Sequence, residues 1–224
     1  MDALELKLMN DYASKRRAMV KALEGRGISS RVLDAMESVP RHLFMPEHVR
    51  ASAYEDKPLP IGEGQTISAP HMVAIMCELL DPPEGGRLLE VGGGMGYHAA
   101  VLAELAGSSG KVITVERLKR LATSATRSLA EAGYANVEVV VGDGTLGYPE
   151  EAPFDGISIA CSAPSVPPPL YEQLKVRGKM VIPMGSTSQT LYLIVRASES
   201  KFEQEAWGGV IFVPLVGKYG FSSG

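Results

Sequence analysis

The spacing of apolar residues predicts three helices before residue 81. Between residues 4 and 23 apolar side chains recur at helical spacing among basic ones, which indicates an amphipathic helix. A shorter helix is predicted over residues 31–39, where a proline ends it. Residues 46–68 carry several prolines and glycines and are expected to be mostly loop. A third helix is predicted over residues 69–80, with Pro70 in its first turn.

After Gly86 the pattern changes to short apolar runs that alternate with helical stretches. Such alternation is typical of βαβ units with a parallel sheet. The predicted strands are residues 87–91, 111–115, 137–141, 154–159 and 179–183, and the predicted helices are residues 97–106, 118–132 and 170–174. Two further runs, residues 190–195 and 210–213, have no convincing helix between them, which suggests an antiparallel strand pair at the end of the sheet.

Together these elements predict an α/β fold with a Rossmann-like sheet. We expect helices on both faces of the sheet, an antiparallel C-terminal strand pair and an N-terminal helical extension. A chain of 224 residues is long enough for one domain of ordinary size. We therefore expect a single domain over residues 1–224, with a helical and loop region over residues 1–80 and an α/β core over residues 81–224.

Composition and charge narrow the possible functions. The formal net charge of -4 offers no broad attraction for phosphate backbones, so a general nucleic-acid binder is disfavoured. Cys77 and Cys161 lie far apart in the sequence and are expected to be free thiols in a reducing cytoplasm. No run approaches the ~20 apolar residues needed to span a bilayer, and the histidine spacings match no metal-ligand set. We expect a cytoplasmic protein without a bound metal.

A glycine-rich turn after the first strand of the α/β region is the main chemical feature. Glycine is needed where the backbone turns tightly and a ligand approaches it closely. The dinucleotide pattern Gly-x-Gly-x-x-Gly fails, because Tyr97 stands where the third glycine after Gly92 and Gly94 should be. The chain reads instead as Glu-x-Gly-x-Gly-x-Gly, from Glu90 to Gly96. A glycine loop alone can equally be a structural turn.

Acidic residues follow the next two predicted strands. Glu116 stands 20 residues beyond Gly96 (116 − 96), where a carboxylate can accept hydrogen bonds from both hydroxyls of a ribose. Asp143 follows the third strand, between Gly142 and Gly144. Either acid alone could be a solvated strand end or a helix cap. Three matches at the carboxyl ends of successive strands, however, lie where open α/β sheets bind ligands.

The glycine loop resembles the first motif of class I methyltransferases, and residues from about 26 to 221 resemble the protein-L-isoaspartate O-methyltransferase family. The resemblance is carried above all by Gly-Gln-Thr-Ile-Ser-Ala-Pro-His-Met at residues 64–72. Further matching stretches are residues 39–44, 54–62, 142–144, 152–157, 173–175, 181–185 and 213–216, the last matching the closing strand of that family. Arg177 and the pair Cys161-Ser162 depart from the family pattern, but they lie outside the cofactor motifs, so we expect them to affect substrate preference.

The resemblance implies S-adenosylmethionine as cofactor and isoaspartyl proteins and peptides as substrates. We also expect the protein to act as a monomer. The resemblance further implies that Ser68 is the active-site residue and that Asp143 contacts the adenine amino group. The residues expected to bind the cofactor are Gln65, Thr66, Ile67, Ser68, Glu90, Gly92, Gly93, Gly94, Gly96, Glu116, Arg117, Gly142, Asp143 and Gly144. Ser68 could also cap the helix that begins near Ala69, and both roles could hold at once.

The reaction implied by the resemblance is transfer of a methyl group from S-adenosylmethionine to the free α-carboxylate of an isoaspartyl residue. It needs positioning of the substrate rather than a strong base, because this carboxylate is already ionised at pH 7. Ser68 would orient this carboxylate by a hydrogen bond. A covalent role is disfavoured, because no Gly-x-Ser-x-Gly elbow surrounds Ser68. A nucleic-acid adenine methyltransferase would need Asp/Asn-Pro-Pro-Tyr/Phe after the fourth strand, whereas residues 160–164 read Ala-Cys-Ser-Ala-Pro. A protein that only binds the cofactor stays an open alternative, and an NAD-linked oxidoreductase is disfavoured by the failed third glycine.

Overall fold

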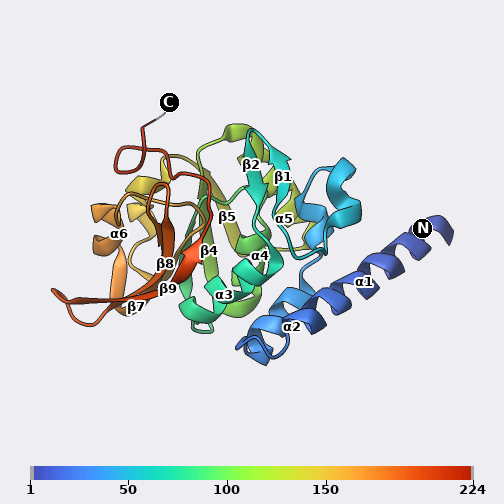
Figure 1. Ribbon diagram of the computed structural model, residues 1–224, viewed down its shortest axis with the longest axis horizontal. Coiled ribbons are helices and arrows are strands. Elements are labelled where there is room, and N and C mark those ends of the chain that lie inside the picture. Colours follow the sequence, from blue (N-terminus) through green and yellow to red (C-terminus); the bar gives the residue numbers. More distant parts are fainter. Residues whose placement is uncertain (1–2, 223–224) are drawn as a thin grey trace.

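The computed structural model describes residues 3–222, with side chains from residue 10 onward, and a seven-stranded sheet lies at its centre (Figure 1). The strand order is β5-β4-β3-β6-β7-β8-β9. The strands are β3 (Arg87–Val91), β4 (Lys111–Glu116), β5 (Val137–Val141), β6 (Phe154–Ile159), β7 (Leu174–Met184), β8 (Gln189–Arg196) and β9 (Phe202–Val210). Strands β3 to β7 are parallel, and β8 and β9 pair antiparallel. The predicted α/β class and its antiparallel C-terminal pair are confirmed.

Neighbouring side chains on the central strands enter two different hydrophobic cores, because successive residues of a strand point to opposite faces. Leu88 belongs to the core that includes residues of the first five α-helices, and Leu89 to the core that includes α6. Val112 and Ile113 divide in the same way. Of these helices, α3 (Pro70–Leu80), α4 (Tyr97–Ala106) and α5 (Lys119–Ala132) contact the strands on the first face, and α6 (Pro168–Glu172) belongs to the core of the second face. Helices therefore cover both faces, as predicted.

The first two α-helices of the described residues agree with the sequence pattern. They are α1 (Ala3–Leu23) and α2 (Ser30–Ser38), and they lie to one side of the α/β core in Figure 1. Helix α2 is strongly amphipathic and buries Val32, Leu33 and Met36 against the core that also contains α4. Among the helices of residues 3–222, none has a stretch long and apolar enough to cross a membrane.

The expectation that residues 46–68 are mostly loop is wrong. This segment contains a 3-10 helix, η2 (Glu47–Ser52), and a hairpin of β1 (Leu59–Gly62) and β2 (Gln65–Ile67). In β1 the side chains alternate between buried and exposed, which is the burial pattern of a half-covered strand. Glu63 and the glycines on either side of it adopt positive φ, so the hairpin turns in a left-handed conformation. Strand β1 is only four residues long, and the prolines of this segment favour a loop, so the sequence pattern did not predict the strand.

The last strand also differs from the prediction. Residues 210–213 were expected to form it, but β9 spans Phe202–Val210. Its side chains are mostly exposed, because β9 is the edge strand of the sheet, and it therefore lacks the apolar run by which strands are recognised. The closing strand that the resemblance implied at residues 213–216 is absent from the described sheet, where Pro214 forms only an isolated bridge with Ser162.

Candidate functional site

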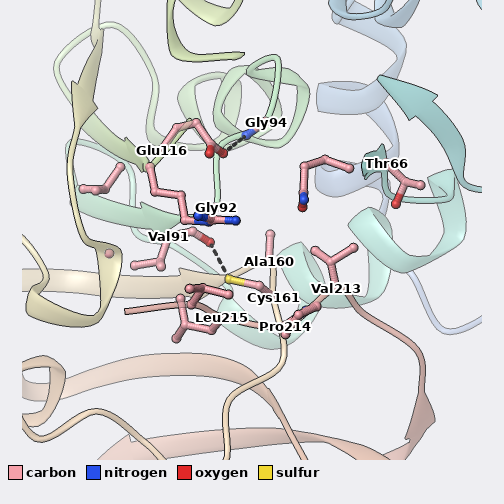
Figure 2. A pocket seen from close by; sticks show the side chains of 15 residues that line it. Thr66, Val91, Gly92, Gly94, Glu116, Ala160, Cys161, Val213, Pro214 and Leu215 are labelled. Carbon is pink, nitrogen blue, oxygen red and sulfur yellow. Dashed lines mark hydrogen bonds between the residues drawn. The ribbon is translucent and has the colours of Figure 1, made fainter. Parts of the chain in front are cut away.

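A cleft opens at the carboxyl ends of β3, β4 and β6 (Figure 2). The chain leaves β3 toward β4 on one side and later returns to β6 on the other side of β3. Open α/β sheets bind ligands at such a switch point, because the loops diverge there. The predicted site residues that line the cleft are Gln65, Thr66, Gly92, Gly94, Glu116, Arg117 and Gly144.

The glycine loop between β3 and α4 forms the floor of this cleft. Gly92, Gly94 and Gly96 have φ of 87°, 55° and 94°, a region that residues with a Cβ rarely adopt. The Gly94 amide donates a hydrogen bond of 2.9 Å to Glu116 Oε2 (Figure 2). Helix α4 begins directly after the loop at Tyr97, so the positive end of its dipole lies beside the cleft.

Glu116 is the last residue of β4. It lines the cleft and connects β4 to the glycine loop through the hydrogen bond from the Gly94 amide. Its side chain is buried, and its second oxygen, Oε1, accepts a hydrogen bond of 2.8 Å from the Leu118 amide. Each oxygen thus accepts one backbone N–H, whereas a carboxylate has about four acceptor sites in all. The remaining lone pairs are available to hydroxyl groups of a ligand in the cleft that Glu116 lines.

A second, larger cavity of about 620 Å³ adjoins the cleft. Thr66, Ala160 and Val213 contribute to the walls of both. Ser68 lines the larger cavity rather than the cleft, and His71, in the first turn of α3, lines it too. The larger cavity would therefore bring a second ligand beside Ser68 and next to the ligand of the cleft.

The capping alternative for Ser68 is wrong. Helix α3 begins at Pro70, its N-cap is Ala69, and no side chain of the cap residue bonds the helix. Asp56 caps the helix from a distance: its Oδ1 accepts hydrogen bonds from the His71 amide at 2.9 Å and from His71 Nδ1 at 2.8 Å. A charged acceptor already satisfies this free amide, so the Ser68 hydroxyl is not needed there.

Comparison with known proteins identifies the family. The sequence profile described as protein-L-isoaspartate (D-aspartate) O-methyltransferase matches residues 14–220, which is nearly the whole chain. The chain belongs to this family.

Curated relatives and solved structures agree with this assignment. The protein-L-isoaspartate O-methyltransferase of Methanothrix thermoacetophila is 60% identical over 194 residues, which cover 87% of this chain and 91% of the relative. Protein-L-isoaspartate O-methyltransferase 1 of Archaeoglobus fulgidus is 56% identical over 212 residues, which cover 94% of this chain and 97% of the relative. A solved protein-L-isoaspartate O-methyltransferase superposes with a TM-score of 0.86 at 30% identity, over 92% of this chain and 67% of that one.

A structure from Plasmodium falciparum, described as a protein-L-isoaspartate O-methyltransferase in complex with S-adenosyl-L-homocysteine, superposes with a TM-score of 0.79. It is 28% identical over 90% of this chain and 98% of that one. The prediction of a class I, S-adenosylmethionine-dependent protein-L-isoaspartate O-methyltransferase is confirmed by the family profile and these relatives.

Glu90 of this methyltransferase lies beneath the glycine loop and does not line the cleft. Its side chain is fully buried, Oε2 accepts a hydrogen bond from the Thr114 hydroxyl, and Oε1 lies 3.5 Å from His98 Nδ1. Burial, with a smaller contribution from the Glu116 carboxylate, raises the pKa of Glu90 to about 8 although the Thr114 hydrogen bond opposes it. Burial lowers the pKa of His98 to about 4. At pH 7 the pair is therefore mostly uncharged.

Asp143 lies at the rim, outside the lining of the cleft. Its Oδ1 accepts hydrogen bonds from the amide and the hydroxyl of Thr145, and its Oδ2 accepts one of 2.8 Å from the Lys218 amide. Burial opposes ionisation, but these hydrogen bonds outweigh it and lower the pKa of Asp143. The carboxylate thus ties the C-terminal segment to the edge of the cleft. The other predicted residues outside the lining are Ile67, Gly93, Gly96 and Gly142.

Several lining residues escaped the sequence prediction. Cys161 is one of them: its Sγ lies 3.8 Å from the Val91 carbonyl oxygen and would lie 3.1 Å from a Cβ at Gly92. Cys161 lies outside the cofactor motifs in the sequence, but in the structure it lines the cleft beside the glycine loop. Cys161 follows strand β6, which pairs with β3, and this position in the sequence could have indicated that it lies near the cleft. The remaining lining residues are Val91, Val115, Ala160, Val213, Pro214, Leu215 and Val216.

We expect Glu90→Gln to stabilise the protein progressively as the pH rises. Between the ordinary pKa of 4.5 and the folded-state value of about 8, the unfolded wild type loses a proton that the folded state keeps. The unfolded state then binds fewer protons, so the unfolding free energy of the wild type falls with pH, and Gln removes this fall. The gain should reach a few kcal/mol, on the order expected for such a shift, near pH 8.

Urea denaturation of both proteins at pH 5 and pH 8 measures this gain. Glu131→Gln, an exposed change on α5, is the control for a general effect of lowering the negative charge. A stability difference between Glu90→Gln and wild type that is the same at both pH values would show that Glu90 ionises normally in the folded protein.

Proposed function

We propose that this chain transfers the methyl group of S-adenosylmethionine to the free α-carboxylate of isoaspartyl residues in proteins and peptides, with Ser68 at the point of transfer. The observation that carries the assignment of Ser68 is the pair of adjoining cavities. Ser68 lines the larger one, and the two share Thr66, Ala160 and Val213 as walls. A cofactor and a polypeptide segment can thus approach each other from different sides and meet beside Ser68.

The cleft residues suit S-adenosylmethionine. We propose that Glu116 accepts hydrogen bonds from the ribose hydroxyls with its remaining lone pairs. We also propose that the segment Gly142 to Gly144, of which Gly144 lines the cleft, lies along the adenine with Asp143 at its amino group. The hairpin β1–β2 contributes Gln65 and Thr66 to one side of the cleft.

When bound, S-adenosylmethionine supplies a methyl group on a positively charged sulfonium. The substrate carboxylate is ionised at pH 7, so the chain has no proton to remove. Ser68 accepts the Arg41 hydrogen bond with its carbonyl oxygen, and its hydroxyl can donate to one carboxylate oxygen. This bond would hold the other oxygen at a near-attack distance of about 3–3.5 Å from the methyl carbon. Met72 and Phe212 line the same cavity and displace water from the anion.

The product ester recloses without the enzyme to a succinimide with release of methanol. Water opens the succinimide partly to normal aspartate, so the biological result is repair. We propose that the enzyme acts as a monomer, because residues of one chain form both cavities. Cys77 and Cys161 are free and buried, as suits a reducing cytoplasm.

The experiment that tests this function uses tritiated S-adenosylmethionine with an isoaspartyl peptide, its normal aspartyl twin and an oligonucleotide. We expect base-labile label in the isoaspartyl peptide alone, because an ester is hydrolysed by base. Label that resists base, or equal label in the aspartyl peptide, would contradict the proposed substrate.

A further inference from the structure

If the larger cavity takes the isoaspartyl substrate, as proposed above, its walls must hold an anion. Its lining includes no lysine and no arginine. His71 is the one lining side chain that can carry a positive charge, and its Nδ1 is bonded to the Asp56 carboxylate, which offsets that charge. An anion taken out of water needs fixed donors or positive charge nearby. Here the positive charge has to come from behind the lining.

Arg41 lies directly behind it, in the 3-10 helix η1 (Arg41–Phe44), and is fully buried. Its Nη2 donates a hydrogen bond of 2.8 Å to the Ser68 carbonyl oxygen, and its Nε donates one of 2.8 Å to the Ala53 carbonyl oxygen. The guanidinium carbon lies 4.5 Å above the centre of the Tyr97 ring. Since the carbonyl and hydroxyl oxygens of one serine are only a few bonds apart, the guanidinium lies within about 7 Å of the Ser68 hydroxyl.

The charge of Arg41 is not neutralised by a contact. Within the part of the chain that the structure describes, no carboxylate forms an ion pair with Arg41, and its Nη1 has no hydrogen-bond partner. The carboxylate that acts on it from a distance is Asp56. That carboxylate is shared with Arg26 at 3.2 Å and with His71. Two arginines therefore surround one acid, which leaves a positive surplus behind Ser68.

The other titratable side chains that act on Arg41 are the phenols of Tyr54 and Tyr97. Burial raises the pKa of both phenols, so both are neutral at pH 7. Burial lowers the pKa of Arg41, but arginine stays protonated in proteins. The surplus charge is therefore present at every pH at which the enzyme works.

Holding the carbonyls of Ala53 and Ser68 does not by itself require a charge, because neutral N–H donors can bond them. A buried cation without an ion-pair partner is costly, so a purely structural role would favour a neutral residue. We propose that Arg41 is a positioning residue for methyl transfer, whose buried positive charge holds the substrate carboxylate at Ser68. The distance involved is shorter than the Debye length of about 8 Å at physiological ionic strength, and buried charges are screened little.

The test compares Arg41→Lys, Arg41→Gln and Arg41→Met. Lys keeps the charge, Gln keeps an N–H donor without charge, and Met keeps only the approximate length. Two peptides that differ only at the isoaspartyl residue, one with the α-carboxylate and one with an α-carboxamide, are titrated into each protein. S-adenosylhomocysteine is present throughout, because this thioether has no sulfonium charge to contribute. Binding is followed by calorimetry, so the readout does not depend on catalysis.

We expect the wild type to prefer the carboxylate peptide at least tenfold, since a fixed charge at this distance is worth that much or more. Arg41→Gln and Arg41→Met should bring this preference close to one by weakening the carboxylate peptide alone, and Arg41→Lys should keep most of it. In turnover, KM for the isoaspartyl peptide should rise about tenfold in Arg41→Gln, with a smaller change in kcat.

Equal weakening of both peptides would overturn the proposal, because it indicates a distorted cavity. An unchanged preference in Arg41→Gln, or a loss as complete in Arg41→Lys, would overturn it as well. If Arg41→Met does not fold, the Lys and Gln variants still separate charge from hydrogen bonding. Failure of the proposed function is distinct from these outcomes, because the wild type would then methylate no isoaspartyl peptide.

Discussion

Gly93→Ala is expected to weaken the binding of S-adenosylmethionine on the order of 10- to 100-fold and to lower stability. Unlike the other glycines of its loop, Gly93 is not among the residues with positive φ, so its backbone conformation suits alanine. The space around Gly93, however, is too small for the added methyl group. A Cβ there would overlap Thr114 Oγ1, which is buried and donates a hydrogen bond to Glu90. Overpacking a rigid site lowers the free energy of unfolding by about 1–3 kcal/mol. If the glycine loop shifts to relieve the overlap, the Gly94 amide moves away from Glu116.

The measurement is a calorimetric titration with S-adenosylhomocysteine, together with urea denaturation. Thr114→Ala supplies the matched control, because it removes the hydroxyl that blocks the new methyl group. Gly93→Ala combined with Thr114→Ala should bind the ligand much better than Gly93→Ala alone, and Thr114→Ala by itself measures the cost of depriving Glu90 of its donor. Affinity in the double variant that stays as low as in Gly93→Ala would mean that the overlap with Thr114 is not the cause.

The cofactor side of the site could be predicted because its signals are local. The glycine loop and Arg117 follow directly after a strand, Glu116 is the last residue of one, and parallel strands bring their carboxyl ends to one edge. Chain order therefore places these residues together without any knowledge of packing, and all of them line or floor the cleft. Glu90 belongs to the same motif, but its buried side chain contacts Thr114 of β4 and His98 of α4 and does not line the cleft.

The region around Ser68, where we propose that the substrate binds, depends on contacts between segments that are distant in the sequence. The spacing of apolar residues along the chain cannot show such contacts. Asp56 caps α3 across 15 residues, and the Arg41 side chain reaches Ser68 across 27. Neither pairing has a sequence spacing that predicts it. The sequence therefore indicates the adjacent Ser68 as a candidate cap of this helix. Strand β9 was missed for a related reason: an edge strand with exposed side chains has no apolar pattern, and its pairing with β8 defines it.

Ser68→Asp is expected to abolish most methyl transfer while the protein stays folded and binds its cofactor. Because Asp56 supplies the cap of α3, changing the Ser68 hydroxyl should leave stability within about 0.5 kcal/mol. The new carboxylate, however, would stand where the substrate carboxylate must arrive. Two like charges about 4 Å apart repel by about 4 kcal/mol at an intermediate dielectric, which corresponds to about a thousandfold in kcat/KM. The glycine loop and Glu116, which bind the cofactor in our proposal, are untouched.

Ser68→Asn is the matched control, because it has the size of Asp without the charge. Ser68→Ala completes the set by removing only the hydrogen bond, which should cost about 1.5–3 kcal/mol of transition-state binding. The series thus predicts a smaller loss in Ala and Asn than in Asp, with similar melting temperatures and cofactor affinities throughout. Isoaspartyl-peptide methylation, thermal denaturation and cofactor titration on the same preparations measure all three quantities. Equal activity of the Asp and Asn variants would place the substrate carboxylate away from Ser68, and it would also remove the anion on which the role of Arg41 depends.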